Sequence, residues 1–595
     1  MALDFNPLEF FLEEIRNDTA NIKIGAVNKV EMIASALGPQ KTVSDLIPAL
    51  SSCITEERFA NDEEFLFSLA KQFATLSDYT GGNQKLLIPP LELLAAQEET
   101  VIRDQAVQSL CAIVERHRDP NQIVQDDIVD TLCRLSTKTD FFTARVSACA
   151  LFPCTYKYAN TEQKEQLRKL YATICADDTP MVRRAAAHKM KDIFEVCQKQ
   201  DVLEDFIGVY KALSEEDTQD TIRVACVHTT LVLAKMFTAE ENRLHTVKVV
   251  RGATEDRSWR VRLTVAKSFP DMCKSFGTDI TQTDLLECIR ALMRDQEHEV
   301  RKEAVKSIDC CLNNSSNEKW NLTSDQLKEY IIPIFQSNTV ADSMQQVRAA
   351  LASVIGNVAK TVGRDVTQRQ LLPMISDLMK DEYHDVRLSI VSQSGIICDV
   401  LGVDGLIHSL LHSIQSLIMD NHWRIRQSVV EQVPFLAKLF GVDMYQSKLE
   451  ALFLSSLRDS VHHVRATAIN CIEEIAVSFG SKWVVDRLFP KISEQYSQSA
   501  GYANRVTTLQ VLPKLATVMR PEEVNDLILP IITKAFKDGV PNVRFCSLRM
   551  LLALLQKNRL PKSSITGIKS TLADLQTDSD ADVQFYAYQV QKACN

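Results

Sequence analysis

The most regular feature of the sequence is a stripe of apolar residues at helical spacing that returns about every 39 residues. In one copy the stripe consists of Val182, Ala186, Met190, Ile193 and Cys197, and its steps of 4, 4, 3 and 4 residues follow one face of an α-helix. Two later copies have the same steps: Ile425, Val429, Val433, Leu436 and Phe440, and Val464, Ala468, Ile472, Ile475 and Phe479. The pattern predicts a helix in the same phase in each copy.

A basic residue marks the start of most of the predicted helices. In twelve copies it is an arginine, which usually follows Val or Ile: Arg103, Arg145, Arg183, Arg223, Arg262, Arg301, Arg348, Arg387, Arg426, Arg465, Arg505 and Arg544. Lys23 and Gln584 occupy the two outer places, and the place near Phe65 and Leu66 lacks the arginine, which predicts 15 repeats with atypical terminal copies. The longest step, from repeat 8 to repeat 9, contains the segment 313–325 and predicts an enlarged loop there.

A period near 40 residues is typical of HEAT repeats, in which each copy contributes two antiparallel helices. The first helix often carries a proline after two apolar residues: Pro48, Pro89, Pro333, Pro373, Pro490 and Pro530. An interior proline removes a helical hydrogen bond and bends the helix. The expected fold is therefore an all-α superhelix, a solenoid of about 15 HEAT repeats.

An aspartate lies six residues before the arginine in nine repeats, in the predicted turn between the two helices. We expect the Asp and Arg to satisfy backbone groups of the turn and to link adjacent repeats in a ladder of charge-assisted hydrogen bonds. A solvated surface pair would contribute little, but recurrence at a fixed phase argues against it. The predicted ladder includes Asp217, Arg223, Asp256, Arg262, Asp295, Arg301, Asp381, Arg387, Asp420, Arg426, Asp459, Arg465, Asp538 and Arg544.

Composition narrows the function classes. The chain has 595 residues, 45% hydrophobic and 24% charged, with a net charge of −10, so nucleic-acid and membrane partners are disfavoured. The first residues lack the pattern of a signal peptide, and no apolar run approaches the length of a membrane span. The 16 scattered cysteines suit a reducing compartment. We expect a cytoplasmic protein, with nuclear residence left open.

Motifs for catalysis, cofactors or metals are not found. The sequence has no phosphate-binding glycine loop, no dinucleotide fingerprint, no HExxH and no CxxC pair. His462 and His463 are adjacent and would point in different directions on a helix, so we expect no shared metal. An enzyme with an appended helical array would need a non-repeating block. The continuous repeat therefore predicts a non-catalytic protein whose function lies on its surface.

Two tryptophans stand out on the predicted turns. Trp259-Arg260 and Trp423-Arg424 each place a Trp three residues before a ladder arginine. Exposed Trp and Arg are enriched among residues that dominate protein interfaces. The alternative is that each Trp packs sideways on the next repeat.

Several stretches resemble the A (scaffold) subunit of protein phosphatase 2A. They are EETVIRDQAVQSL (98–110), CADDTPMVRRAAAHKM (175–190), the WRVR and WRIR turns, RVTTLQVL (505–512) and PNVRF (541–545). The resemblance implies a horseshoe of 15 HEAT repeats in a heterodimer or heterotrimer. It implies that residues 1–400 bind an exchangeable regulatory B subunit, whereas residues 401–595 bind the phosphatase catalytic subunit. A HEAT-type nuclear transport receptor is the alternative; it would normally be longer and less regular, with an acidic inner loop.

The resemblance also assigns residues. It implies catalytic-subunit contacts at Trp423, Arg424 and Arg505, and at His462, which stands where the family usually has Tyr. For the B subunit it implies contacts at Glu98, Glu99, Phe141, Asp177, Pro180, Met181, Arg183, Arg184, Trp259 and Arg260. Phe141 and Phe142 replace the Trp-Phe that is usual in the family. Arg183 is ambiguous because it is also a ladder residue.

Overall fold

The computed structural model describes residues 7–594 except 18, 61, 117–123, 139, 140, 313–321, 403–406, 500, 561–563, 565 and 566. The described residues form helices and short connections, without a β-strand. Packing divides them into two compact units, which we call the N-terminal unit, up to Ser307, and the C-terminal unit, from Ile308 onward. The expected enlarged loop, 313–325, lies largely outside the described residues.

The N-terminal unit contains repeats 1–8. Its α-helices are α1 (Pro7–Ile15), α2 (Ala20–Val27), α3 (Val30–Lys41), α4 (Ile47–Thr55), α5 (Glu63–Thr75), α6 (Ile88–Ala95), α7 (Thr100–Arg116), α8 (Val124–Thr137), α9 (Phe142–Tyr158), α10 (Thr161–Cys175), α11 (Pro180–Phe194), α12 (Lys199–Asp201), α13 (Ile207–Glu215), α14 (Asp220–Met236), α15 (Ala239–Thr254), α16 (Trp259–Ile280), α17 (Leu286–Leu292) and α18 (His298–Cys310), the last of which contains the boundary between the units.

The C-terminal unit contains repeats 9–15. Its α-helices are α19 (Ser324–Gln326), α20 (Ile332–Ile334), α21 (Gln345–Val362), α22 (Arg364–Val366), α23 (Leu372–Leu378), α24 (His384–Ser392), α25 (Ser394–Leu401), α26 (Ile407–Ile418), α27 (Trp423–Lys448), α28 (Glu450–Ser456), α29 (His462–Trp483), α30 (Phe489–Gln498), α31 (Tyr502–Leu515), α32 (Pro521–Glu523), α33 (Leu529–Ala535), α34 (Pro541–Gln556), α35 (Lys569–Leu575) and α36 (Ala581–Cys594).

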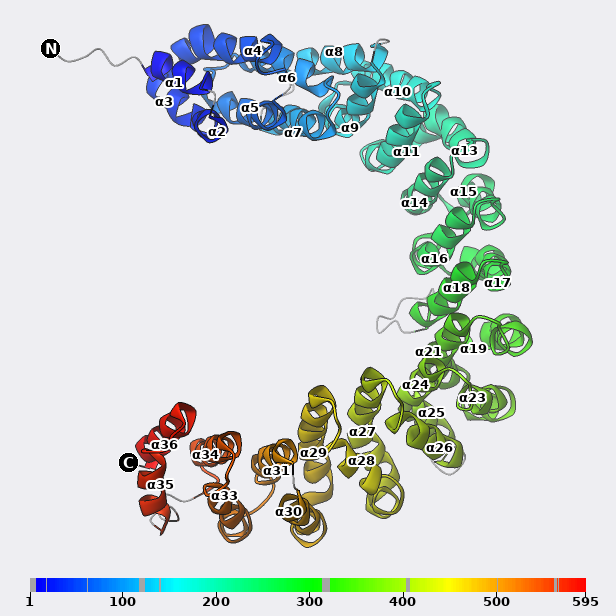
Figure 1. Cartoon of the computed structure of the whole chain (residues 1–595). Helices are drawn as coiled ribbons and strands as arrows, with labels where there is room; N and C mark the ends of the chain where they lie inside the picture. The colour runs from blue at the N-terminus through cyan, green and yellow to red at the C-terminus, as the bar shows by residue number, and fades with distance from the viewer. Residues whose placement is uncertain are drawn as a thin grey trace, which may run out of the picture. The chain divides into compact units, whose positions relative to one another are not determined.

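Within each unit the helices form two layers, because each repeat packs on the next with equivalent helices side by side (Figure 1). In the N-terminal unit the second helices α7, α9, α11, α14 and α16 contact one another in sequence, and the first helices α8, α10, α13, α15 and α17 do the same. This arrangement confirms the predicted solenoid of helix pairs. It leaves the turn that leads into each second helix on one side of its unit.

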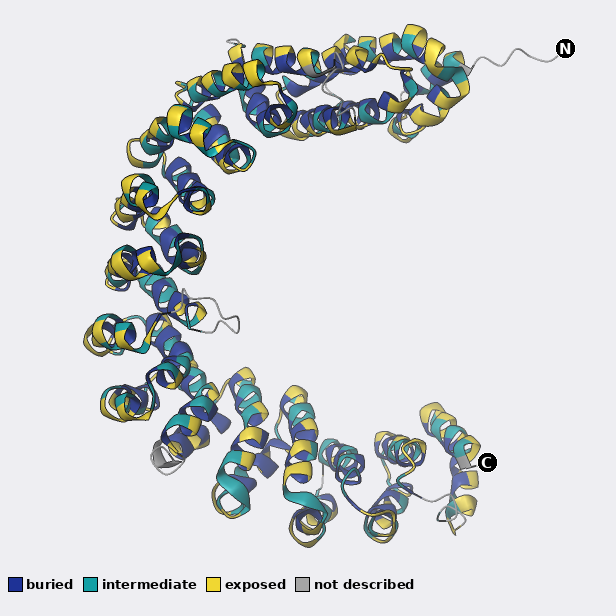
Figure 2. Cartoon of the chain, turned by 180° about the vertical axis from the view of Figure 1, so that it is seen from behind, coloured by how far each residue is buried: buried dark blue, intermediate teal, exposed yellow. Residues whose placement is uncertain are grey.

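The core lies between the two layers, where Figure 2 shows the buried residues. The predicted stripe of repeat 5 is buried at Val182, Ala186, Met190 and Ile193, while Cys197 is half-buried. The stripes of repeats 11 and 12 show the same burial: all of their residues are buried except the last, Phe440 and Phe479, which are half-buried. Burial of one face per helix therefore accounts for the periodicity of the sequence.

The first helices contain π-helical turns, which the sequence did not predict. They are η1 (Thr42–Leu46), η4 (Val202–Phe206), η5 (Thr281–Leu285), η6 (Leu327–Ile331), η7 (Phe335–Thr339), η8 (Thr367–Leu371), η9 (Val484–Leu488) and η10 (Val524–Ile528), while η2 (Leu76–Tyr79) and η3 (Gln84–Leu87) are 3₁₀ turns.

Five of these π turns start six residues before a proline of the first helix. Before Pro48, the N–H of Ile47 donates to the carbonyl of Thr42, five residues back, which widens the helix where the proline ring would meet a carbonyl. The same turn forms where Gly208 and Glu287 occupy the proline position. Assigning the irregularity to the prolines alone is therefore wrong.

Six of the joints between repeats contain a glycine in the left-handed region. These are Gly38, Gly277, Gly363, Gly402, Gly441 and Gly480, with φ between 77° and 85°. Other residues rarely adopt this φ, and here it redirects the chain between a second helix and the following first helix.

Candidate docking surface

The turn before each second helix is built around the predicted Asp and Arg. In repeat 5, Asp177 Oδ1 accepts the backbone N–H of Thr179 at 2.8 Å, and α11 begins at the following residue. Arg183 lies in the first turn of α11, and its Nη1 donates back to the carbonyl oxygen of Asp177 at 2.8 Å. Repeat 7 has the same bonds, from Ser258 N–H to Asp256 Oδ1 and from Arg262 Nη1 to the Asp256 carbonyl. The pair thus satisfies backbone groups of its own turn.

The same arginine also reaches the aspartate of the following repeat. We call this bidentate contact, from Nε and Nη2 to the two carboxylate oxygens, a rung. In the N-terminal unit the Nε–Oδ2 distances are 2.7 Å for Arg145–Asp177 and Arg183–Asp217, 2.6 Å for Arg223–Asp256 and 2.5 Å for Arg262–Asp295. The rungs therefore join repeats 4–8 without interruption.

Burial and hydrogen bonding oppose each other at these carboxylates. Burial raises the pKa of Asp256, but the hydrogen bonds from Arg223 and from the Ser258 N–H outweigh it and lower the pKa below 3.8. Asp177, Asp381 and Asp459 show the same balance, so the pKa of each is lowered. The aspartates of these rungs stay ionised at neutral pH.

The described residues of the C-terminal unit form four rungs. They are Arg348–Asp381, Arg426–Asp459, Arg505–Asp538 and Arg544–Asp578, with Nε–Oδ2 distances of 2.6–2.8 Å. Arg387 and Arg465 bond only to carbonyls of their own turns, and within the described residues the Nε of each has no hydrogen-bond partner. The predicted link from Arg387 to Asp420 is therefore wrong.

The terminal repeats keep parts of the arrangement. Lys23 forms an ion pair with Asp62 of the next repeat. Gln584 Nε2 donates at 2.6 Å to the carbonyl of Asp578, which is the bond that arginine makes in other repeats. Lys23 and Gln584 thus occupy the places that the period assigned to them.

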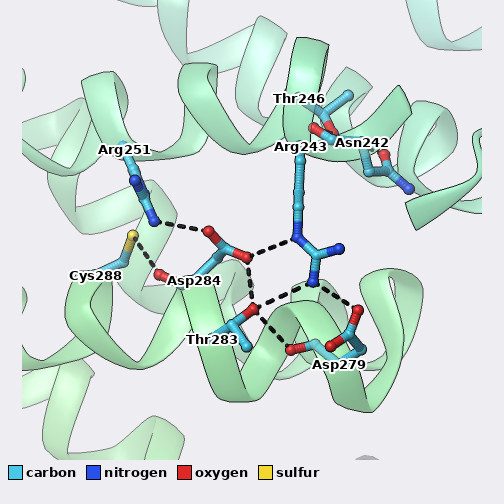
Figure 3. Close-up of polar contacts among 8 residues, drawn as sticks. All are labelled: Asn242, Arg243, Thr246, Arg251, Asp279, Thr283, Asp284 and Cys288. Carbon is cyan, nitrogen blue, oxygen red and sulfur yellow. Dashed lines mark hydrogen bonds and ion pairs between the residues drawn. The ribbon is translucent and has the colours of Figure 1, made fainter. Parts of the chain in front are cut away.

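A second set of contacts links the first-helix layer, as the close-up of repeats 7 and 8 shows (Figure 3). Arg243 on α15 bonds to Asp279 at 2.6 Å and to Asp284 at 3.3 Å. Arg251, two turns further along α15, bonds to the other oxygen of Asp284 at 2.7 Å. Adjacent repeats of this region are thus linked in both layers.

The Trp259 side chain lies at the surface of the N-terminal unit. Trp259 is the first residue of α16, rather than a turn residue, and it is 40% exposed. The guanidinium of Arg260 lies 5.9 Å from its ring centroid and also approaches Asp220 of the preceding repeat at 3.6 Å. The ring therefore offers an open apolar face beside a cation.

Trp423 occupies the equivalent place in repeat 11, at the first residue of α27, and is half-buried. Its ring centroid lies 5.3 Å from that of His463 in the next repeat, and the Arg424 guanidinium lies 4.8 Å from the Trp423 ring. Trp423 therefore packs partly on the next repeat, as the alternative interpretation of its motif predicted. The exposed His462 and His463 begin α29 beside it.

Apart from Trp259 and Arg260, the residues expected at the N-terminal repeats lie at the turns of repeats 3, 4 and 5. Glu98, Glu99 and Phe141 line one groove of about 540 Å³, which extends across the turns of repeats 2–4. On repeat 5, Pro180 begins α11, Met181 is 52% exposed, and the neighbouring Arg184 is exposed as well.

Two other expected contact residues of the repeat 5 turn, Asp177 and Arg183, are engaged in rungs. Their side chains link neighbouring repeats.

Tyr502 is an exposed aromatic residue that was not predicted from the sequence. It is the first residue of α31, 51% exposed, and three residues before Arg505. Trp259 and Trp423 occupy the same place before Arg262 and Arg426, so this spacing was the signal that could have identified Tyr502. Arg505, which the resemblance assigned to a partner contact, forms the rung to Asp538.

Among the described residues, no cluster of His, Cys, Asp and Glu is suited to hold a metal ion. Nor does any helix of the part of the chain that is described have the length and apolar character needed to cross a bilayer.

Comparison with known proteins supports the resemblance seen in the motifs. Residues 364–494 match the family model "PIK3R4-like, middle domain". A protein phosphatase 2A scaffold subunit of Dictyostelium discoideum is 35% identical over 294 residues, which cover 49% of each chain. The beta isoform of the human 65 kDa regulatory subunit of serine/threonine-protein phosphatase 2A is 33% identical over 378 residues, covering 63% of this chain and 61% of the human one.

The chain thus spans about half the length of the first of these relatives and 61% of the second. Over those stretches it is similar to protein phosphatase 2A scaffold subunits. A chain in the solved structure of Kap95p with RanGDP aligns with a TM-score of 0.59 at 11% identity, covering 99% of this chain and 83% of that one. At that identity the likeness concerns the fold alone, and it confirms the HEAT-repeat solenoid.

Proposed function

We propose that this protein is the non-catalytic scaffold of a protein phosphatase 2A-type Ser/Thr phosphatase. Repeats 11–15, within residues 401–595, hold the catalytic subunit, while an exchangeable regulatory B subunit binds within residues 1–400. The homology to scaffold subunits supports this assignment. The structural observation that carries it is the pair of Trp-Arg sites, at Trp259 and Trp423, presented at equivalent places in two repeats.

Scaffolding would act through local concentration. Two proteins bound to one chain meet as if they were parts of one molecule, so their effective concentration rises without any chemistry by the scaffold. The phosphatase reaction belongs to the bound catalytic subunit.

Two double variants test this division of the surface. Trp423→Ala with Arg424→Ala should weaken catalytic-subunit binding at least about a hundredfold, because both hot-spot side chains of that site are removed. Trp259→Ala with Arg260→Ala should weaken B-subunit binding and leave the catalytic subunit bound. Both affinities are measured with purified subunits by calorimetry or interferometry.

Leu244→Ala is the matched control, because Leu244 is 54% exposed but lies on a first helix, away from the turns. It should change neither affinity. Thermal unfolding separates binding from packing: the Trp423 variant should lose little stability beyond its contact with His463. A collapse of stability, or unchanged binding in both double variants, would contradict the proposal.

A further inference from the structure

Arg465 stands at an interruption in the ladder of the C-terminal unit. Its Nη1 donates to the carbonyls of Asp459 and Ser460 at 2.7 and 3.2 Å, so the guanidinium is fixed against its own turn. Its Nε is buried and has no hydrogen-bond partner within the described part of the chain. A buried donor on a cation that lacks an acceptor is costly, and a carboxylate is the group whose geometry matches it.

The sequence explains why Arg465 forms no rung. Ser499 occupies the place of the rung aspartate in repeat 13, because Arg505 Nη1 donates to the Ser499 carbonyl at 3.2 Å, as other arginines do to their aspartates. Ser499 follows Arg465 by 34 residues, the spacing of Arg183 and Asp217. Arg387 differs, because Asp420 is present 33 residues after it. At Arg465 this chain supplies no carboxylate at the matching position.

The surroundings of Ser499 are basic. One groove of about 710 Å³ is lined by Ser499, Arg505, Lys534 and Lys537 among others. A second groove, of about 500 Å³, includes Arg458, Lys491 and Gln498, which precedes Ser499. Three of these basic side chains, Arg458, Lys534 and Lys537, are exposed, and no ion pair within the described residues engages them.

Acidic groups in the two grooves do not cancel this charge. Asp538 is engaged in the rung from Arg505, and the buried Glu450 engages Lys491. Only Glu494 adds an exposed carboxylate to the lining. Residues 495–499 therefore separate two grooves that both attract negative charge.

We propose that an acidic segment of the catalytic subunit lies across the turns of repeats 12–14 and places one carboxylate on Arg465. That carboxylate takes the position that a rung aspartate occupies elsewhere, and the exposed Arg458, Lys534 and Lys537 attract the segment's remaining charges. The site continues the surface of Trp423, His462 and Tyr502, which lie at the first residues of the second helices of repeats 11–13. This inference rests on the proposed role of repeats 11–15 and adds the chemistry of the partner.

The proposal can be tested by placing a carboxylate of this chain itself beside Arg465. Ser499→Asp should supply the missing carboxylate, occupy Arg465 and weaken the binding of purified catalytic subunit by at least about tenfold. Ser499→Asn has the same shape without the charge and should bind within about twofold of the unchanged protein. Affinity is measured on the full chain at low and at high salt, and the salt dependence should decrease with Ser499→Asp.

Arg465→Gln is an independent test. Glutamine keeps the turn bond, as Gln584 does in repeat 15, but removes the charge, so we expect a loss of affinity of at least about tenfold. Equal binding by the Asp and Asn variants, or an Arg465→Gln variant within twofold of the unchanged protein, would overturn the inference. Failure of the unchanged protein to bind the catalytic subunit would instead contradict the proposed function.

Discussion

Repeats 4–8 and repeats 9–15 use the same motif to different extents. In the first group every arginine from Arg145 to Arg262 forms a rung with the next repeat. In the second group, rungs at Arg348 and Arg426 alternate with arginines that bond only to their own turns, Arg387 and Arg465. The motif therefore has two separable roles, one inside the turn and one between repeats.

Asp420 shows this separation most directly. Its Oδ1 accepts the N–H of His422 at 2.8 Å, which is the turn bond of all the ladder aspartates, yet Arg387 does not pair with it. Asp256 makes the same turn bond and also receives Arg223. Replacing each by asparagine keeps the turn acceptor and removes only the charge.

The largest expected effect is on the intact rung. Asp256→Asn should lower the free energy of unfolding of the repeats around it by about 3 kcal/mol, because Arg223, 4% exposed, would lose its carboxylate. Asp420→Asn should cost less than about 0.5 kcal/mol, because no rung exists there. Native-state hydrogen exchange of α14, α16, α24 and α27 measures both. An equal loss of unfolding free energy at Asp256 and Asp420 would contradict the distinction between a rung aspartate and a turn aspartate.

A smaller effect is expected from pH. The pKa of Asp256 is lowered in the folded protein, so its stabilisation is complete above about pH 4, the range in which an unfolded aspartate is ionised. It is lost as the pH falls further, through the lowered pKa of the folded state. The difference in melting temperature between the unchanged protein and Asp256→Asn should therefore narrow between pH 7 and pH 3. A constant difference would mean that charge does not stabilise the rung.

The smallest expected effect comes from restoring a missing rung. Ser499→Asp should raise the free energy of unfolding by about 1 kcal/mol, because the gain from pairing the buried Arg465 Nε is largely offset by the cost of desolvating the new carboxylate. The measurement is urea-induced unfolding of the unbound chain. Ser499→Asn again controls for shape: an equal gain with asparagine would locate the stabilisation in the turn rather than between repeats.

The fold followed from the sequence because its signals are local and repeated. The apolar stripes mark the buried face of each second helix, and the arginine period placed even the substitutes Lys23 and Gln584 correctly. The π turns were missed because they depend on backbone hydrogen bonding that side-chain identity does not fix, as Gly208 and Glu287 at the proline position show.

The surface was less predictable. The sequence does not reveal that Asp420 lies outside a rung. Asp420 is present at the correct spacing from Arg387, so only the packing of repeats 10 and 11 determines whether the two side chains meet. Trp259 and Trp423 have the same local motif, but the His463 ring across the joint makes the second less exposed. Contacts between neighbouring repeats thus limit what a motif within one repeat can predict. The partner-binding roles of these residues stay predictions.

The left-handed glycines have a consequence for how such a chain can change length. Gly363, Gly402, Gly441 and Gly480 follow one another at intervals of 39 residues, each at the same joint. Excision or duplication from one of these glycines to the next removes or adds one whole repeat and rejoins the backbone at a similar conformation. Because each repeat packs mainly on its neighbours, recombination at these points would lengthen or shorten the solenoid in fixed increments without creating a new kind of interface.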